Sequence, residues 1–176
     1  QLIEHVIDQM NLDKCRHALV GNHVIRGISG GEMKRLALAV ALLAAEARAM
    51  FIDEPTSGLD SSMASDVMSA LQRLQHEDGR TIILTIHQPS IDIYKAFDKL
   101  MLLSGGHLVF FGGANNSLEF FSTQGFAYEA GVNIAEYLID CISSESTVEY
   151  YANSQLCEEN KKEVKELSAI VHAVDA

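Results

Sequence analysis

Two adjacent carboxylates, Asp53 and Glu54, directly follow the short apolar run from Ala49 to Ile52. The carboxyl ends of strands in α/β sheets are where such proteins gather their ligands. An Asp at such a place can hold magnesium, usually through water, and an adjacent Glu can orient or deprotonate an attacking water. The pair by itself is also compatible with a simple cap for the following turn, so the neighbouring segments decide between the two interpretations.

The segment Ser29-Gly30-Gly31-Glu32 offers a second kind of chemistry. A Ser followed three residues later by Glu is the capping-box signature, which predicts a helix starting here and running through the good helix formers of residues 33–46. The free N–H groups and the dipole of a helix N-terminus attract an anion, and glycines allow its close approach to the backbone. Taken alone, the segment is equally typical of an ordinary helix cap.

The elements that position these residues follow from the spacing of apolar side chains. Residues 49–52 and the β-branched residues 81–86 are predicted to be buried strands. Met63, Val67, Leu71 and Leu74 predict a helix between them, which ends at the turn of residues 78–79. The order strand, helix, strand predicts a parallel sheet with a right-handed crossover.

The flanking parts of the chain predict further helices and one hairpin. A short amphipathic helix is expected over residues 2–10, and a hairpin over residues 100–111 at the end of the sheet, with its turn at Ser104-Gly105-Gly106. Helices are expected at about 116–124 and 134–142. Residues 156–174 carry one apolar stripe among charged residues, which predicts a helix that docks weakly or extends a linker.

Composition narrows the classes of protein. With 176 residues the chain has the length of one domain, and its net charge of −11, from 24 acidic and 13 basic residues, argues against nucleic acid as a partner. The three cysteines, widely separated, fit neither a disulfide framework nor a zinc site, which favours a reducing, cytosolic compartment. The longest apolar run, residues 36–45, is about half of the roughly 20 residues that a membrane span requires. The first residue is Gln1 rather than Met, so we expect the chain to be a piece of a longer protein.

Four segments in chain order resemble the signature, Walker B, D-loop and switch-histidine elements of ATP-binding-cassette (ABC) ATPases. They are residues 28–32, 51–54, 57–60 and 86–90, and the last of them contains Ile86-His87-Gln88-Pro89-Ser90. The resemblance spans residues 1–142 and is greatest for the ABCG (White) transporter subfamily. It implies an α/β fold, a partial P-loop NTPase-type three-layer sandwich with parallel core strands, a terminal hairpin and C-terminal helices. Residues 143–176 would then form a helical tail or linker toward a membrane domain that this chain does not contain.

The resemblance also implies a role for each segment, with ATP and Mg²⁺ as the cofactors. The signature residues would contact the γ-phosphate of ATP held mainly by a second nucleotide-binding domain, in a homo- or heterodimer. Asp53 would hold the metal, Glu54 and His87 would be catalytic, and the D-loop would link the two sites. The residues implied in binding are Ser29, Gly30, Gly31, Glu32, Ser57, Gly58 and Asp60.

The chain departs from the family pattern in four places. Met33 stands where Arg is usual, Ile134 stands in place of an Asn-Pro pair, and residues 46–48 replace a segment that usually carries Pro. The fourth departure is the largest, because no GxxxxGK[ST] phosphate-binding loop and no Gln-loop occurs in the sequence. Each charge-assisted hydrogen bond lost with that loop is worth about 1.5–3 kcal/mol. We therefore expect the chain alone neither to bind nor to hydrolyse ATP appreciably.

Three functions are compatible with these patterns. The first is the ATPase segment of an ABCG-type transporter at the cytosolic face of a membrane, which couples ATP hydrolysis at a dimer interface to export of an amphipathic or lipid-like substrate. The second is a soluble ABC ATPase that acts in translation or on DNA ends, which residues 86–90 fit poorly. The third is a non-catalytic remnant that binds a partner cassette through its signature and D-loop, and the missing phosphate-binding loop leaves it open.

Overall fold

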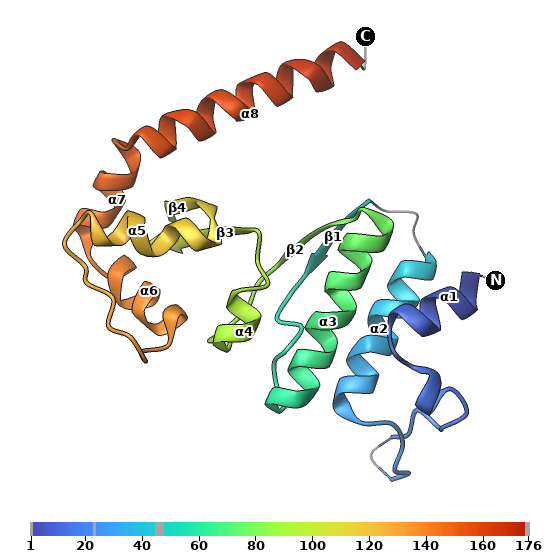
Figure 1. Ribbon diagram of the computed structural model, residues 1–176. Helices are drawn as coiled ribbons and strands as arrows, with labels where there is room; N and C mark the ends of the chain where they lie inside the picture. Colours follow the sequence, from blue (N-terminus) through green and yellow to red (C-terminus); the bar gives the residue numbers. More distant parts are fainter. Residues whose placement is uncertain (1, 23, 45–47, 175–176) are drawn as a thin grey trace. The chain divides into compact units, whose positions relative to one another are not determined.

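The computed structural model describes residues 2–22, 24–44 and 48–174, and it divides into two compact units, residues 1–88 and 89–176. The first unit carries the signature-like, Walker B-like and D-loop-like segments together with His87. The second carries the predicted hairpin and the C-terminal helices (Figure 1). The α/β class expected from the sequence is confirmed.

The first unit consists of helices and one pair of strands: α1 (Leu2–Gln9), the 3₁₀ turn η1 (Asp13–Cys15), α2 (Gly30–Ala44), β1 (Ala49–Ile52), α3 (Ser61–Asp78) and β2 (Thr81–Leu84). The predicted helices at residues 2–10 and between the strands are confirmed. Gly79 ends α3 with a left-handed φ of 62°, as a C-cap glycine does. The sequence predicted that α2 ends at Glu46, but this residue lies outside the described residues. So does residue 47, which with residue 46 belongs to the segment that departs from the family pattern.

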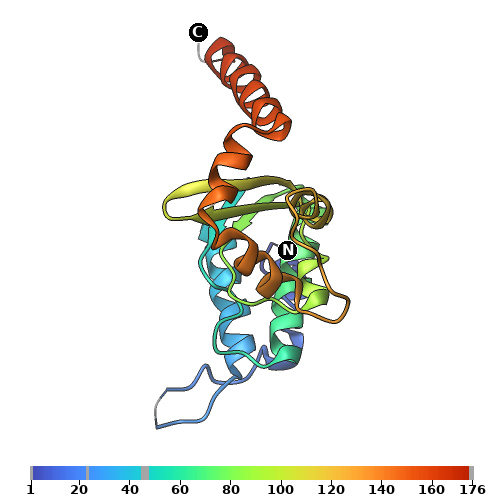
Figure 2. The same cartoon turned by 90° about the vertical axis from the view of Figure 1, so that its left-hand side faces the viewer.

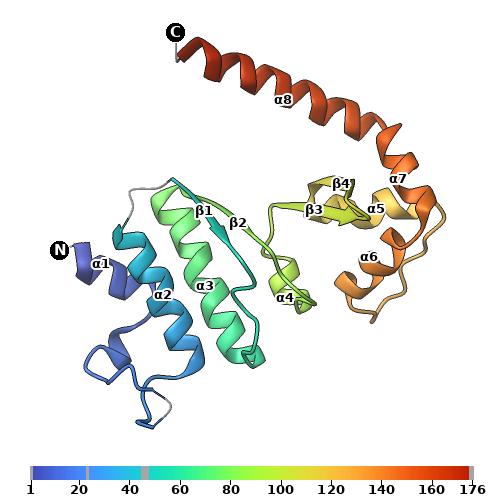
Figure 3. The ribbon, with the colours of Figure 1, turned by 180° about the vertical axis from the view of Figure 1, so that it is seen from behind.

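The strands β1 and β2 pair in parallel, with Ala49 opposite Thr81 and Ile52 opposite Leu84. The prediction that they are buried is wrong. Phe51 is 79% exposed and Ile83 is 51% exposed, on the face that both strands share. The reason is that α3 lies on one side of the pair (Figure 1), and no helix of residues 2–88 lies over the other side (Figure 3).

The core of the first unit is formed by the three helices rather than by the sheet. Helix α2 packs against both α1 and α3. The buried apolar residues of these three helices and of the segment after α1 are Val6, Met10, Leu12, Ala39, Leu42, Ala64, Val67, Met68, Ala70, Leu71 and Leu74. The stability of this unit therefore depends mainly on helix packing, and the helices hold the strand ends in place.

The second unit contains α4 (Ile91–Tyr94), β3 (Lys99–Ser104), β4 (His107–Gly113), η2 (Ala114–Asn116), α5 (Ser117–Ser122), α6 (Ile134–Ile142), α7 (Glu145–Ala152) and α8 (Gln155–Val174). The predicted hairpin is confirmed, but it forms an antiparallel two-stranded sheet of its own instead of the end of a larger sheet. The helix α7 was not predicted. The core of this unit comprises Tyr94, Val109, Phe110, Ala114, Phe121, Ile134, Tyr137, Leu138 and Cys141.

The long helix α8 contacts the rest of its unit in its first half. The Asn160 amide donates to the Phe111 carbonyl over 2.7 Å and to the Tyr151 hydroxyl over 3.1 Å, and Lys99 Nζ of β3 lies 4.0 Å from Glu163 Oε1. Beyond these contacts the helix extends away from the hairpin in every view (Figures 1 to 3), and Val164, Leu167 and Ile170 are 55 to 61% exposed. The predicted helix is thus confirmed. Among the described helices, α8 included, none is both long and apolar enough to cross a membrane.

Candidate active site

Asp53 and Glu54 lie at the carboxyl end of β1, and the side chain of Thr85 connects them. The Thr85 hydroxyl donates a short hydrogen bond to Asp53 Oδ1 and accepts one from the Glu54 N–H over 3.0 Å. The Thr85 N–H in turn donates to the Ile52 carbonyl over 3.0 Å, which continues the ladder of the parallel strands. Both carboxylates are exposed, so the pair faces solvent at the edge of the sheet where ligands of α/β proteins bind.

The backbone of Glu54 is in an unusual conformation. Its φ of 43° lies in the left-handed region, which costs a non-glycine residue of order 1–3 kcal/mol and is common at functional sites. Side chains from two other elements hold it there, because its N–H binds Thr85 and its carbonyl accepts a hydrogen bond from Lys34 Nζ over 3.1 Å. The same carbonyl accepts the Ser57 N–H over 3.2 Å.

The N-terminus of α2 has the capping box that the sequence predicted. The Ser29 N–H donates to Glu32 Oε2 over 2.7 Å, and the Glu32 N–H donates to Ser29 Oγ over 3.3 Å. The Ser29 N–H lowers the pKa of the Glu32 carboxyl below its ordinary value, and the Ser29 hydroxyl adds to this. The N–H groups of Gly30 and Gly31 belong to the first turn of α2, whose donors have no partner inside the helix.

The two glycines of this turn face different surroundings. A Cβ on Gly31 would lie 3.0 Å from Met63 Cβ and 3.3 Å from Met63 Cγ, so α2 and α3 are in tight contact there and a side chain would require Met63 to shift. A Cβ on Gly30 would meet only Leu59 Cδ2, at an ordinary 3.5 Å. Packing therefore favours glycine at position 31, whereas Gly30 leaves an open, exposed surface at the helix end.

The segment from Ser57 to Asp60 forms a tight turn that starts α3. Gly58 has a φ of 72°, the Leu59 N–H donates to the Thr56 carbonyl, and Asp60 caps α3 by accepting the Met63 N–H over 2.9 Å. The helices α2 and α3 lie side by side, and their N-termini are at the same end of the unit (Figures 1 and 2). Ser57, Gly58 and Asp60 are all exposed there.

His87 follows β2 as Glu54 follows β1, so the parallel register places it at the same edge of the sheet. It is exposed and, within the described residues, has no hydrogen-bond partner. Its neighbour Gln88 also has a left-handed φ, of 43°. In the second unit the carbonyl of the next residue, Pro89, accepts a hydrogen bond from the Asn133 amide over 3.2 Å, and Asn133 also caps α6.

Comparison with known proteins gives two matching family profiles and several similar transporters. A family profile described as "AAA domain, putative AbiEii toxin, Type IV TA system" matches residues 27–93, which contain all four, and one described as "ABC-2 type transporter" matches residues 87–163. ABC transporter G family member 11 of Arabidopsis thaliana is 45% identical over 144 residues, which are 82% of this chain and 20% of that protein. The broad substrate specificity ATP-binding cassette transporter ABCG2 of Bos taurus is 44% identical over 145 residues, 82% of this chain and 22% of that protein.

The chain belongs to the ABC transporter G family. A further relative, G family member 14 of Arabidopsis thaliana, is 38% identical over 164 residues, which are 93% of this chain and 24% of that protein. The chain thus spans about a fifth of the length of the G-family transporters that it matches. It represents a portion of their ATP-binding domain in which the sequence has no phosphate-binding loop.

Within this G-family chain, the structure brings together most of the residues that the sequence singled out. Asp53, Glu54 and the D-loop are joined by direct backbone contacts, and the signature glycines pack on the D-loop and α3. Sequence reasoning missed Thr85 and Lys34. Thr85 could have been found by extending the parallel register one residue beyond Ile52 and Leu84, which sets it opposite Asp53. No local pattern indicates Lys34, because its contact depends on how α2 packs.

The acid pair fits a magnesium site of the kind that this family's chemistry requires. Magnesium bound with a phosphate substrate needs only one or two protein carboxylates and keeps several waters. Asp53 is the carboxylate suited to this role, and the described residues contain no group of three or more His, Cys, Asp or Glu side chains that could hold a metal without a substrate. Only one Asp53 carboxylate oxygen is occupied by Thr85, which leaves the other for a metal-bound water.

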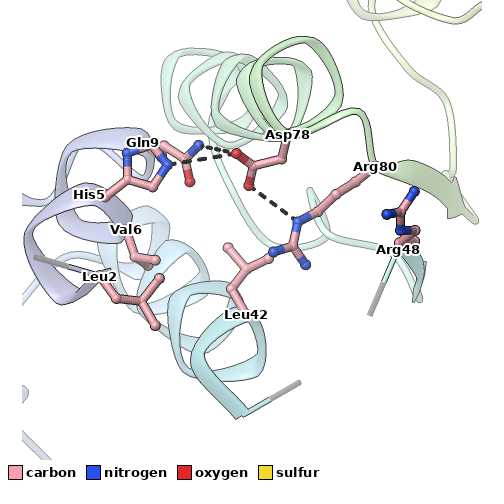
Figure 4. Close-up of a pocket in the computed structure, with 8 residues that line it drawn as sticks. All are labelled: Leu2, His5, Val6, Gln9, Leu42, Arg48, Asp78 and Arg80. Carbon is pink, nitrogen blue, oxygen red and sulfur yellow. Dashed lines mark hydrogen bonds and ion pairs between the residues drawn. The ribbon is translucent and has the colours of Figure 1, made fainter. Parts of the chain in front are cut away.

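A pocket of about 340 Å³ lies at the opposite end of the strands, next to their first residues (Figure 4). Its polar side is centred on Asp78, which accepts hydrogen bonds from Gln9 over 3.0 Å and from Arg80 over 3.2 Å. Burial raises the pKa of Asp78, but these hydrogen bonds and the Arg80 charge outweigh it and hold that pKa below its ordinary value. The pocket contains none of the signature, Walker B or D-loop residues, so it is separate from the candidate active site.

Proposed function

We propose that this chain is the hydrolytic part of an ATP-binding cassette of an ABCG-type transporter, in which ATP hydrolysis at a dimer interface drives export of an amphipathic or lipid-like substrate. The observation that carries the proposal is the joint packing of three segments. The signature helix α2, the D-loop and the Asp53–Glu54 pair form one exposed surface at the carboxyl end of the strands. Residues 1–142 belong to the cassette, and residues 143–176 lead to a membrane domain of the longer protein.

At the signature, the chain offers donors to the phosphates of an ATP molecule held by a second cassette. The Ser29 hydroxyl and the N–H groups of Gly30 and Gly31 lie at the first turn of α2, where the helix dipole adds to their attraction for an anion. Hydrogen bonds from such donors to phosphate are charge-assisted and short. The second cassette is therefore the main partner of this chain, as a homo- or heterodimer.

At the strand ends, the chain offers the groups that hydrolyse ATP held by its own phosphate-binding loop. Asp53 would hold Mg²⁺ through water, and the metal would neutralise charge that develops on the phosphates. The Glu54 carboxylate accepts the proton of the attacking water or orients it, and His87 donates a hydrogen bond to the γ-phosphate. The phosphate-binding loop must come from outside the 176 residues.

The test uses the chain as it is, together with a partner that supplies ATP. The partner is the ATP-binding domain of a G-family relative with its own signature serine replaced by arginine, which prevents it from pairing with itself. We expect residues 1–176 to associate with this partner only when Mg-ATP is present, and we expect Ser29→Arg in the chain to abolish the association. Association that is equally strong without ATP would refute the proposal.

A second measurement separates the transporter segment from the non-catalytic remnant that the sequence left open. Isothermal calorimetry of the chain alone should show no low-micromolar binding of Mg-ATP, because the sequence has no phosphate-binding loop. Linking a relative's phosphate-binding loop to the chain should restore hydrolysis that depends on Glu54. Restored ATP binding without hydrolysis would favour the remnant.

A further inference from the structure

Lys34 reaches from the signature helix to the backbone of the acid pair. It lies in the second turn of α2, one turn after the Ser29–Gly31 segment, and is half-buried. Its Nζ donates to the Glu54 carbonyl over 3.1 Å, across a sequence separation of 20 residues. A cation that donates to a backbone carbonyl makes a charge-assisted hydrogen bond, which is stronger than a neutral one.

Glu54, which accepts this hydrogen bond, has a strained backbone conformation that the hydrogen bond helps to stabilise. The left-handed φ of Glu54 persists only if surrounding groups hold it. The Thr85 hydroxyl accepts its N–H, and its carbonyl accepts both Lys34 Nζ and the Ser57 N–H. The Glu54 peptide groups are therefore fixed by the residue after β2, by the D-loop and by α2. A small movement of α2 therefore changes the geometry of Glu54 through Lys34, while Thr85 continues to hold the other side.

The two ends of this connection belong to different nucleotide sites under the proposed function. The N-terminus of α2 contacts ATP held by the partner, whereas Glu54 serves ATP held by its own cassette. We propose that Lys34 is a positioning residue that couples the two: ordering of the first turns of α2 by the partner's nucleotide strengthens the bond from Lys34 to the Glu54 carbonyl and fixes Glu54 for catalysis. This inference rests on the proposed function, because it requires that the signature surface bind a partner's ATP.

The experiment follows hydrogen exchange of the Glu54 amide by NMR in isotope-labelled residues 1–176. Exchange is measured for the chain alone and for the chain saturated with the G-family partner domain described above, loaded with a non-hydrolysable ATP analogue. Four proteins are compared: wild type, Lys34→Met, Lys34→Arg, which keeps a donor of similar reach, and Lys14→Met. The last is a matched control, because Lys14 is exposed in η1 of the same unit and contacts neither α2 nor Glu54 through any hydrogen bond within the described residues.

The loaded partner should slow exchange of the Glu54 amide about tenfold in wild type, Lys34→Arg and Lys14→Met, the size of one charge-assisted hydrogen bond. In Lys34→Met the slowing should be less than about twofold. A structural role alone would lower stability in both states and would not remove the response to the partner.

Three results would overturn the inference. Equal slowing in Lys34→Met and wild type would show that Lys34 carries no coupling, and partner binding without slowing in wild type would show that Glu54 is not coupled at all. Loss of partner binding in Lys34→Met alone would make Lys34 part of the binding surface instead. Absence of partner binding in every protein would refute the proposed function itself, which the first two results leave intact.

Discussion

The two signature glycines should respond in opposite ways to the same substitution. Alanine is intrinsically better than glycine in a helix by up to about 1 kcal/mol. At Gly30 the added Cβ meets only Leu59 Cδ2 at 3.5 Å, so Gly30→Ala should leave the free energy of unfolding unchanged or raise it by up to about 1 kcal/mol. At Gly31 the Cβ would lie 3.0 Å from Met63 Cβ, a side-chain atom bonded directly to the α3 backbone that no side-chain rotation moves away. Overpacking of this kind costs about 1–3 kcal/mol, so Gly31→Ala should lose about 1 kcal/mol net.

Although Gly30→Ala should not destabilise the fold, it should weaken binding to the partner domain. Its Cβ would stand on the exposed end of α2, where the partner's phosphate is expected to approach within a hydrogen-bond distance of roughly 2.9 Å. Gly30→Ala should therefore weaken ATP-dependent association with the partner domain at least about tenfold although the fold is intact. Urea unfolding followed by circular dichroism measures the first effect, and association by analytical ultracentrifugation measures the second. If Gly30→Ala associates as well as wild type, the end of α2 does not contact the nucleotide.

Four further substitutions test the site and the elements that hold it. Asp60→Ala removes the acceptor for the Met63 N–H and should cost about 0.5–2 kcal/mol in urea unfolding. Glu32→Gln tests the capping box through pH: because the folded-state pKa of Glu32 is lowered, its contribution to stability is present above the ordinary value of 4.5 and is lost as the pH falls through the folded pKa. Stability measured across that range should fall less steeply in the Gln variant. Phe51→Ser should change the free energy of unfolding by less than about 0.5 kcal/mol, whereas Leu71→Ala should cost about 2–5 kcal/mol.

Each of these outcomes can fail in a recognisable way. An Asp60→Ala variant as stable as wild type would mean that the cap does not order the D-loop turn. A steeper acid dependence in Glu32→Gln would contradict the lowered pKa. A large loss from Phe51→Ser would show that the exposed face of the sheet is covered when the chain is in solution.

The sequence predicted the local elements around the site because each has its own signal. The capping box at Ser29 and Glu32, the periodic apolar residues of α3 and the Gly79 stop are encoded within a few residues of where they act. The parallel pairing of β1 and β2 follows from their order along the chain. These features needed no knowledge of tertiary contacts.

The burial of the strands could not be predicted in the same way. A short apolar run predicts that a strand is covered on both faces, but the covering groups come from elsewhere in the chain. Within the first unit, the described residues supply α3 on one face of β1 and β2 and no helix on the other, and Phe51 and Ile83 are exposed. The helix α7 was missed for a related reason, because its eight residues show little apolar periodicity and are helical through packing on β4.

The two carboxylates can be recognised in the sequence, whereas the residues that hold the backbone of Glu54 cannot. Asp53 and Glu54 stand out because two charges directly after an apolar strand are unusual, whereas Thr85 and Lys34 are ordinary residues in ordinary positions. Their importance arises only from the geometry of Glu54, whose left-handed backbone needs a partner for its N–H and another for its carbonyl. Thr85 lies directly after the neighbouring strand, Lys34 lies on the signature helix, and the Ser57 N–H of the D-loop also donates to this carbonyl. A change in any of these elements therefore acts on the backbone of the same residue.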